Sequence, residues 1–215
     1  MTTPSASGGR GKQRRTLAVN DLRWAPTVRA LREVTLEIGR VKLEFVTIEG
    51  VFSSKRVDPG SLTLLRSLPQ LPSSGHVLDL GCGYGAVGLA IAAQSPGLTV
   101  WATDEDDLAL ALCRLNASRL GLTNVRVARP DAVPTDVRFS AICSNPPLHV
   151  RRDDLVSTLV WWLMRLRPDG AGYFVVHRNM GPDSLARQLN GRGHRTTRLR
   201  SSSGYRVFRV DPRER

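Results

Sequence analysis

The sequence has few cysteines, very little lysine and no long hydrophobic run. Cys82, Cys113 and Cys143 are its three cysteines, and they form no Cys-x-x-Cys pair. This spacing argues against a zinc site or a disulfide framework and favours a reducing, cytoplasmic compartment. No apolar stretch approaches the roughly 18 residues that a membrane-spanning helix needs, which excludes an integral membrane protein. We therefore expect a cytoplasmic protein with neither a metal nor a membrane partner.

The charge of the chain is strongly positive and unevenly distributed. Its 215 residues carry 31 Lys and Arg against 19 Asp and Glu, a formal net charge of +12, and 28 of the 31 basic residues are arginine. Residues 1–40 hold 8 basic and 3 acidic side chains and residues 178–215 hold 10 and 3, whereas residues 76–150 hold 5 and 7. A coding bias of the genome would explain why most basic residues are arginine and not lysine. It explains less well why the basic residues are concentrated at the two ends of the chain. We expect the two ends of the chain to contact a polyanion.

Composition and patterning divide the chain into three segments. Residues 1–16, rich in Gly, Ser, Thr and Arg, predict a disordered basic tail. Residues 17–70 predict a β-hairpin that turns at Gly39-Arg40, followed by a short helix that starts after Asp58 and runs to about residue 68. Residues 71–215 alternate between strand and helix signals.

The third segment predicts the architecture. Strands are expected at 76–80, 98–103, 124–128, 139–144 and 172–177, helices at 84–94, 104–120, 153–166 and 182–190, and a closing antiparallel pair at 194–199 and 205–210. Strands that alternate with helices of this length form a parallel sheet covered on both faces. The predicted fold class is α/β: a doubly wound, mostly parallel seven-stranded sheet with an N-terminal β-hairpin extension.

The first strand of this sheet ends in a glycine-rich sequence. Ligands of such sheets bind outside the carboxyl ends of the strands, where this chain has Asp79-Leu80-Gly81-Cys82-Gly83-Tyr84-Gly85-Ala86. Glycines let the backbone turn sharply and approach a ligand, and the following helix offers free N–H groups. The stretch also fits the dinucleotide pattern GxGxx[GA], so a nicotinamide cofactor has to be weighed. Asp79 favours a ligand that carries an ammonium group over one that carries a pyrophosphate.

Acidic residues follow the next two strands. Asp104 stands 23 residues beyond Gly81, where a carboxylate accepts hydrogen bonds from ribose hydroxyls, and the position equally suits a helix N-cap. NAD and S-adenosylmethionine both contain that ribose, so Asp104 does not separate them. Asp131, after the third strand, is placed to reach an adenine amine, and a solvated turn residue is the alternative.

The fourth strand ends in Ser144-Asn145-Pro146-Pro147-Leu148-His149, the most specific signal in the chain. Two prolines fix φ and remove two N–H donors, which leaves carbonyl oxygens beside the Asn145 side-chain oxygen. Such a group of acceptors can hold both hydrogens of a planar amine and direct its lone pair at an electrophile. A dehydrogenase has no use for this arrangement, and a proline-rigidified loop is the plainer alternative.

These motifs resemble a known family. DLGCGYGAVGLA with Asp104, SNPPLH, and GVFSSKRVDPGSLTLL at residues 50–65 resemble class I S-adenosylmethionine-dependent methyltransferases of the methyltransferase small domain type. They are similar in particular to the catalytic domain of bacterial small-subunit ribosomal RNA guanine-N2 methyltransferases, over about residues 45–180. The resemblance implies the class I methyltransferase fold and S-adenosylmethionine as cofactor. It also implies methyl transfer to an exocyclic amine, guanine N2 in 16S rather than 23S RNA, with ribosomal RNA or a ribosomal subunit as partner.

The resemblance also implies roles for individual residues. Gly81, Gly83 and Gly85 would cradle the methionine part of the cofactor, Asp104 would bind its ribose and Asp131 its adenine. The complete set of expected cofactor contacts is Asp79, Gly81, Cys82, Gly83, Gly85, Asp104, Glu105, Asp131 and Ala132. The target amine would be held by Asn145, Pro146 and Pro147. The substrate base would be contacted by Phe52, Leu148 and His149, with Phe52 and Gly60 on a segment over the cofactor or substrate.

Two departures from the family limit what the resemblance transfers. Leu148 stands where the family has an aromatic residue that stacks on the base, an interaction worth roughly 1–3 kcal/mol, and His149 is the candidate replacement. Only about 45 residues precede the match, where bacterial members carry a further domain. Two alternatives stay open: a protein glutamine-amide methyltransferase that acts on a translation factor, and a catalytically silent S-adenosylmethionine-binding protein that binds RNA.

Overall fold

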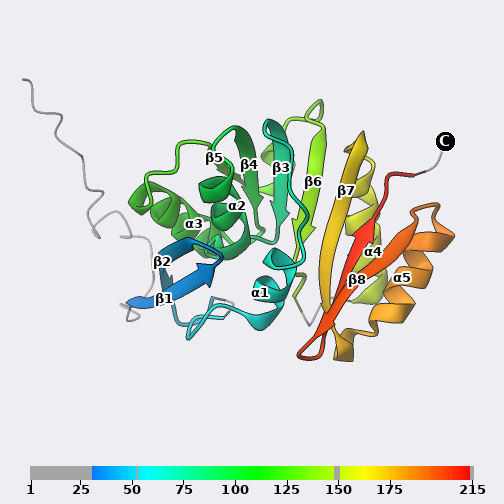
Figure 1. The fold of residues 1–215 in the computed structure, drawn as a ribbon, viewed down its shortest axis with the longest axis horizontal. Coiled ribbons are helices and arrows are strands. Elements are labelled where there is room, and N and C mark those ends of the chain that lie inside the picture. Colours follow the sequence, from blue (N-terminus) through cyan, green and yellow to red (C-terminus); the bar gives the residue numbers. More distant parts are fainter. Residues whose placement is uncertain (1–30, 52, 148–150, 214–215) are drawn as a thin grey trace, which may run out of the picture.

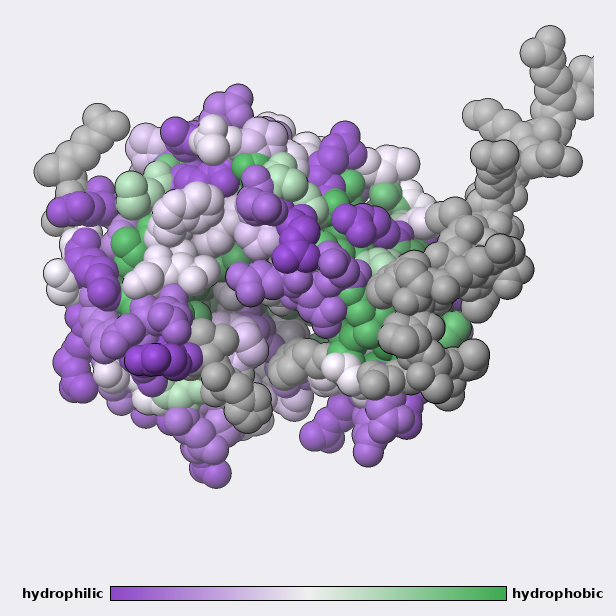
Figure 2. Space-filling model, turned by 180° about the vertical axis from the view of Figure 1, so that it is seen from behind, coloured by the Kyte–Doolittle hydropathy of each residue, from purple (hydrophilic) through white to green (hydrophobic). Residues whose placement is uncertain are grey.

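The structure, a computed structural model, describes residues 31–51, 53–147 and 151–213. The predicted tail at residues 1–16 lies outside these ranges. Within them, no helix has the length and apolar character needed to cross a bilayer. Seen from behind, the surface is mainly hydrophilic, and hydrophobic residues appear only in small areas (Figure 2).

Seven strands of the described chain form one central sheet in the order β5-β4-β3-β6-β7-β9-β8 (Figure 1). Their bounds are β3 (Gly75–Leu80), β4 (Leu98–Thr103), β5 (Val125–Ala128), β6 (Phe139–Ser144), β7 (Leu166–His177), β8 (Thr196–Ser202) and β9 (Tyr205–Val210). Strands β3 to β7 run parallel, and β9 lies antiparallel between β7 and β8. The predicted sheet and its closing antiparallel pair are confirmed.

Helices cover both faces of this sheet. Helices α1 (Pro59–Leu65), α2 (Ala86–Gln94) and α3 (Asp107–Arg119) pack on one face, and α4 (Arg152–Leu163) and α5 (Pro182–Gly191) pack on the other. Single-turn 3-10 helices occur at Pro130–Ala132 (η2) and Arg178–Met180 (η3). Strand β6 is buried at all positions, as expected for a parallel strand covered on both faces.

The hairpin of β1 (Leu31–Ile38) and β2 (Val41–Ile48) is confirmed, with its turn at Gly39-Arg40. Its apolar side chains join the core under α2 and α3. Asn116 of α3 is fully buried, and its side chain pairs with the backbone of Val46 in β2. It accepts from Val46 N (2.7 Å) and donates to Val46 O (2.9 Å), as the backbone of an adjacent strand would. It also donates to Tyr84 O in the glycine-rich loop (2.9 Å). The hairpin is thereby tied to that loop.

The predicted boundary between helix α4 and strand β7 is wrong. Helix α4 ends at Leu163 instead of residue 166, and β7 begins at Leu166 instead of residue 172. The chain already joins the sheet at Arg165, whose carbonyl accepts from Phe139 N (2.9 Å). The register shifts at this point, so residues 167–170 bulge out of the ladder and Pro168 breaks no strand pairing.

Candidate functional site

The carboxyl ends of β3, β4 and β6 meet around a cavity of about 190 Å³. The residues that line it come from the glycine-rich loop, the end of β4, the Asn145 turn and the segment before α1. A second cavity of about 320 Å³ adjoins the first, because Gly81, Asp104 and Pro147 line both. The structure thus brings together motifs that are separated by up to 87 residues in the sequence.

The glycine-rich loop has a backbone that favours glycine. The φ angles of Gly81 and Gly83 are +75° and +55°, in the left-handed region. A Cβ built on either residue would meet no atom within 4 Å. Both residues line the first cavity, so their backbone borders open space rather than packed protein. Gly85, also with positive φ, is the N-cap of α2.

Asp79 lies at the buried floor of the first cavity. Its side chain is 2% exposed, and its Oδ2 accepts a hydrogen bond from Gly88 N in the first turn of α2 (2.7 Å). Burial raises the pKa of this carboxyl from 3.8 to about 7, opposed by the Gly88 hydrogen bond and reinforced by the charge of Asp104. Through this hydrogen bond Asp79 holds α2 behind the glycine-rich loop.

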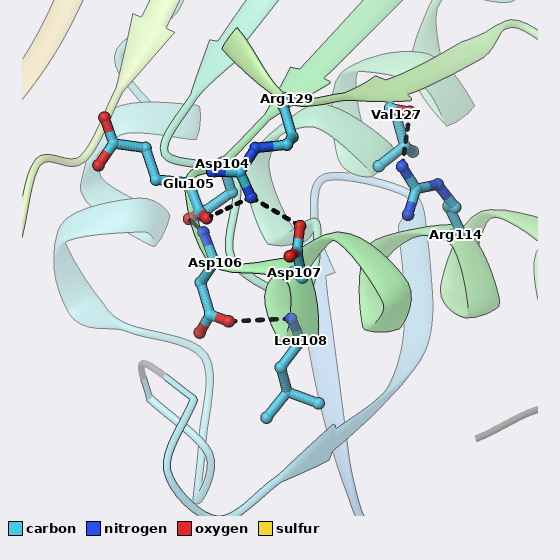
Figure 3. Close-up of polar contacts among 8 residues, drawn as sticks. All are labelled: Asp104, Glu105, Asp106, Asp107, Leu108, Arg114, Val127 and Arg129. Atoms are coloured by element: carbon cyan, nitrogen blue, oxygen red, sulfur yellow. Dashed lines mark hydrogen bonds and ion pairs between the residues drawn. The ribbon is translucent and has the colours of Figure 1, made fainter. Parts of the chain in front are cut away.

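Asp104 connects the end of β4 to the glycine-rich loop. Its Oδ2 accepts from Gly83 N (2.9 Å), and its Oδ1 accepts from Asp106 N (3.0 Å). The N-cap of α3 is Asp106, whose Oδ1 accepts from Leu108 N (2.9 Å; Figure 3). The helix therefore begins at residue 107, three residues later than predicted, and Asp104 faces the cavities.

An arginine at the end of β5 holds the same loop from the other side. Arg129 donates to the carbonyl of Glu105 (3.0 Å) and to the carboxylate of Asp107 (2.7 Å; Figure 3). The Glu105 side chain points away from Arg129, and Glu105 lines the second cavity. These two contacts connect the end of β5 with the loop between β4 and α3.

The predicted adenine residue Asp131 and its neighbour Ala132, another expected cofactor contact, do not line the cavities. Asp131 and Ala132 lie in η2, are exposed and line neither cavity, whereas Pro130 beside them lines the second one. Their contact with a cofactor stays a prediction.

The Asn145-Pro146-Pro147 turn borders both cavities. Asn145 is half-buried and lines the first cavity, and its Nδ2 donates to Asp58 Oδ2 (2.7 Å) and to Ser61 Oγ (3.0 Å). Its Oδ1 accepts no hydrogen bond from the described residues. Pro147 lines both cavities, and Pro146 lines the second.

Sequence reasoning missed three polar residues of the site. Asp58 and Ser61 line the first cavity, although the sequence indicated only a turn and a helix cap there. Tyr84 is 3% exposed, and its hydroxyl has no hydrogen-bond partner in the described part of the chain. Burial and the nearby charge of Asp58 raise the pKa of Tyr84, which keeps the hydroxyl a neutral donor. An unpaired tyrosine hydroxyl has no signature in a single sequence.

The remaining predicted residues divide into two groups. Phe52, Leu148 and His149 lie outside the described residues. Cys82 is buried, and its hydrogen bond with Cys113 and its burial raise the pKa of its thiol well above the ordinary value, so it is no thiolate nucleophile. In the described ranges no three His, Cys, Asp or Glu side chains gather as metal ligands do, and the expectation of no metal stays a prediction.

Comparison of the sequence with known proteins identifies relatives. The methyltransferase small domain family matches residues 42–209. YbxB, an uncharacterized protein of Bacillus subtilis, is 28% identical over 169 residues, 77% of this chain and 84% of that protein. The ribosomal RNA small subunit methyltransferase C of Shewanella amazonensis is 40% identical over 116 residues, 54% of this chain but only 33% of that protein. The chain thus spans about a third of the length of that methyltransferase.

Solved structures agree with this assignment. A 16S rRNA N2 methyltransferase of T. thermophilus, in complex with AdoMet and guanosine, matches with a TM-score of 0.74 at 28% identity, over 88% of this chain and 53% of that chain. A methyltransferase of Pyrococcus furiosus matches with a TM-score of 0.62 at 18% identity, over 78% and 87%, and supports the fold alone. The chain therefore belongs to the methyltransferase small domain family and is an S-adenosylmethionine-dependent methyltransferase.

Proposed function

We propose that this protein methylates an exocyclic amine of a nucleobase in ribosomal RNA, with guanine N2 of the small-subunit RNA as the target. The observation that carries the proposal is the Asn145-Pro146-Pro147 turn, which borders the two cavities beside the glycine-rich loop. Relatives named as small-subunit ribosomal RNA methyltransferases, and the structural neighbour that contains guanosine, support it.

The residues of the first cavity suit the cofactor. When bound, S-adenosylmethionine supplies an activated methyl group on a sulfonium centre. The open space beside Gly81 and Gly83 has room for its methionine part, and Asp79 and Asp104 offer carboxylates to its ammonium group and its ribose hydroxyls. The unpaired hydroxyl of Tyr84 is available to donate to a carboxylate.

The acceptor group at Asn145 performs the positioning that the reaction needs. Asn145 Oδ1 and the proline carbonyls accept the two hydrogens of the target amine, which directs the nitrogen lone pair at the methyl group. The same acceptors stabilise the positive charge that develops on nitrogen while the new N–C bond forms and the old S–C bond breaks. The surplus proton then leaves the amine for solvent, and no covalent bond to the protein is required.

RNA is held outside this site by charge. A paired base must be extruded at a cost of a few kcal/mol, which favours loops and unfolded segments as substrates. Exposed arginines at the end of α5 and along β8 offer phosphate contacts without sequence preference, namely Arg192, Arg195, Arg198 and Arg200.

Transfer of a labelled methyl group from S-adenosylmethionine tests the proposal. Purified small subunits, large subunits, free ribosomal RNA and a translation release factor are the acceptors, and mass mapping locates the product. We expect N2-methylguanosine in small-subunit RNA. Label in the release factor would instead favour the glutamine-amide reaction, and cofactor binding without transfer to any acceptor would favour the silent RNA-binding protein.

A variant of the turn provides the internal control. Asn145→Ala is expected to abolish transfer while cofactor affinity, measured by calorimetry, stays within about twofold of the wild type. If affinity collapses as well, Asn145 has a structural role and the proposed chemistry loses its main support.

A further inference from the structure

The amide of Asn145 is fixed in one orientation by the segment that leads into α1. Both hydrogens of Nδ2 have acceptors, Asp58 Oδ2 at 2.7 Å and Ser61 Oγ at 3.0 Å. An ionised Asp58 only accepts hydrogen bonds, so the amide nitrogen has to face it. The oxygen of the amide consequently faces away from α1, on a residue that lines the first cavity.

The carboxylate of Asp58 is itself held by three donors from three parts of the fold. Besides Asn145, its Oδ2 accepts from Ser61 N as the N-cap of α1 (3.0 Å), and its Oδ1 accepts from the hydroxyl of Tyr205 on β9 (3.4 Å). Asp58 is 8% exposed. In residues 31–51, 53–147 and 151–213, no basic side chain forms an ion pair with it. Its charge is therefore balanced by hydrogen bonds, one of them from Asn145.

Close packing at Gly60 brings β9 to this carboxylate. A Cβ on Gly60 would stand 2.6 Å from Asp58 Oδ2 and 2.7 Å from Cε1 of Tyr205. The Tyr205 ring thus lies directly against the backbone at Gly60, a contact that a side chain there would prevent. One packed unit is therefore formed by the residues at positions 58, 60, 61, 145 and 205.

We propose that Asp58 is a positioning residue for methyl transfer: it orients the Asn145 amide and polarises it towards the target amine. A carboxylate that accepts from an amide N–H strengthens the dipole of that amide, because charge-assisted hydrogen bonds polarise their partners. Asn145 Oδ1, the atom that would receive the amine, becomes a better acceptor. This inference rests on the proposed function for its effect on rate, whereas the fixed amide exists without substrate.

Four variants separate this role from support of helix α1. Asp58→Asn keeps an oxygen for Ser61 N and Asn145 Nδ2 but removes the charge. Asp58→Ala removes the acceptor and frees the amide, and Ser61→Ala removes only the second acceptor because the capping N–H belongs to the backbone. Thr63→Val is the matched control: the buried Thr63 hydroxyl bonds Pro59 O in the same helix (2.7 Å) and contacts none of the five residues above by a hydrogen bond.

The kinetic result expected is a loss of kcat alone. We expect kcat for ribosomal RNA methylation to fall about tenfold in Asp58→Asn and about a hundredfold in Asp58→Ala, with KM for RNA and cofactor affinity within about twofold of the wild type. Thr63→Val should keep the wild-type kcat. The inference is overturned if kcat is unchanged in both Asp58→Asn and Ser61→Ala. It is also overturned if cofactor affinity falls in parallel with kcat in the Asp58 variants, or if Thr63→Val loses as much kcat as they do. Should Asp58→Ala not fold, the other three variants still decide.

A second measurement needs no RNA. The Asn145 side-chain amide signals are identified in heteronuclear NMR spectra by their loss in Asn145→Ala. In the wild type these amide hydrogens should exchange slowly with water. Their signals should shift in Asp58→Asn, and the hydrogens should exchange rapidly in Asp58→Ala. Signals that are the same in the wild type and both Asp58 variants overturn the inference. If the wild type methylates no RNA, the proposed function fails, and the amide signals still report whether Asp58 holds Asn145.

Discussion

At the scale of single residues, the buried carboxyl of Asp79 lowers the stability of the folded protein as pH rises. Its pKa is raised to about 7 in the folded protein from an ordinary value of 3.8, chiefly by burial. Between these two values the folded state binds more protons than the unfolded chain, so this carboxyl makes the protein less stable as pH rises from about 4 to about 7. Under the proposed function, the lost stability is the cost of placing a carboxylate beside the cofactor's ammonium group.

Replacing this carboxyl by its amide isolates the effect. In Asp79→Asn the side-chain oxygen still accepts from Gly88 N, and no buried charge forms. We expect the unliganded variant to melt several degrees above the wild type at about pH 8 and close to it at about pH 4. Cofactor affinity should fall at least about tenfold at the higher pH. Thermal melts and calorimetry measure both, with the exposed Asp136→Asn as control.

An equal Tm for Asp79→Asn and the wild type at both pH values would contradict this account. So would a pH-dependent gain in Asp136→Asn, because that would assign the effect to the net charge of the protein.

At the scale of elements, the hairpin β1–β2 depends on one buried side chain of α3. Asn116→Ala would leave Val46 N, Val46 O and Tyr84 O without their partner, at roughly 1–3 kcal/mol for each buried group. We expect a loss of at least about 3 kcal/mol in the free energy of unfolding, measured with urea, and weaker cofactor binding because Tyr84 belongs to the glycine-rich loop.

The same helix and hairpin supply the control for Asn116. Arg119 of α3 forms an exposed ion pair with Glu33 of β1 (3.3 Å). Such pairs contribute little, so Arg119→Ala should cost less than about 1 kcal/mol. Similar losses in the two variants would mean that the hairpin is held by its apolar contacts and not by Asn116.

Most strands and helices could be predicted from the sequence, whereas contacts between distant segments could not. Strands that end in functional motifs were placed well, because alternation between apolar runs and helical patterns is local information. The boundary between α4 and β7 was missed because Arg165 and Leu166 are fixed by pairing with Phe139, about 26 residues away in sequence. For the same reason the site was predicted through its motifs, while the contacts of Asp58 with Asn145 and Tyr205 were not.

At the scale of the whole molecule, the basic residues of the C-terminal segment lie along one border of the sheet. Strand β8 is the outermost strand on that side, β5 is outermost on the other, and β8 is exposed at nearly all positions. Arg195, Arg198 and Arg200 are all exposed. The excess charge of the C-terminal segment thus lies on a border strand, which β7 and β9 separate from the strands that end at the two cavities.

Salt dependence tests this surface. Each of Arg195→Ser, Arg198→Ser and Arg200→Ser should weaken RNA binding and lower the slope of log K against log salt concentration by up to about 0.7–0.9, with cofactor affinity unchanged. Arg126→Ser removes the same charge from β5, at the opposite border. Equal effects of Arg126→Ser and the β8 variants on RNA binding would mean that only the net charge matters.

The contact of Tyr205 with Asp58 has a consequence for the order in which the protein matures during its synthesis. The parts of the first cavity between residues 79 and 104 follow each other closely along the chain, whereas the Asp58 carboxylate that accepts from Asn145 meets a tyrosine 147 positions later. A chain still emerging from the ribosome contains the whole glycine-rich loop before it contains β9. Only a chain that already contains β9 can complete the contact with Asp58, so this carboxylate gains its third donor after the glycine-rich loop has been synthesised.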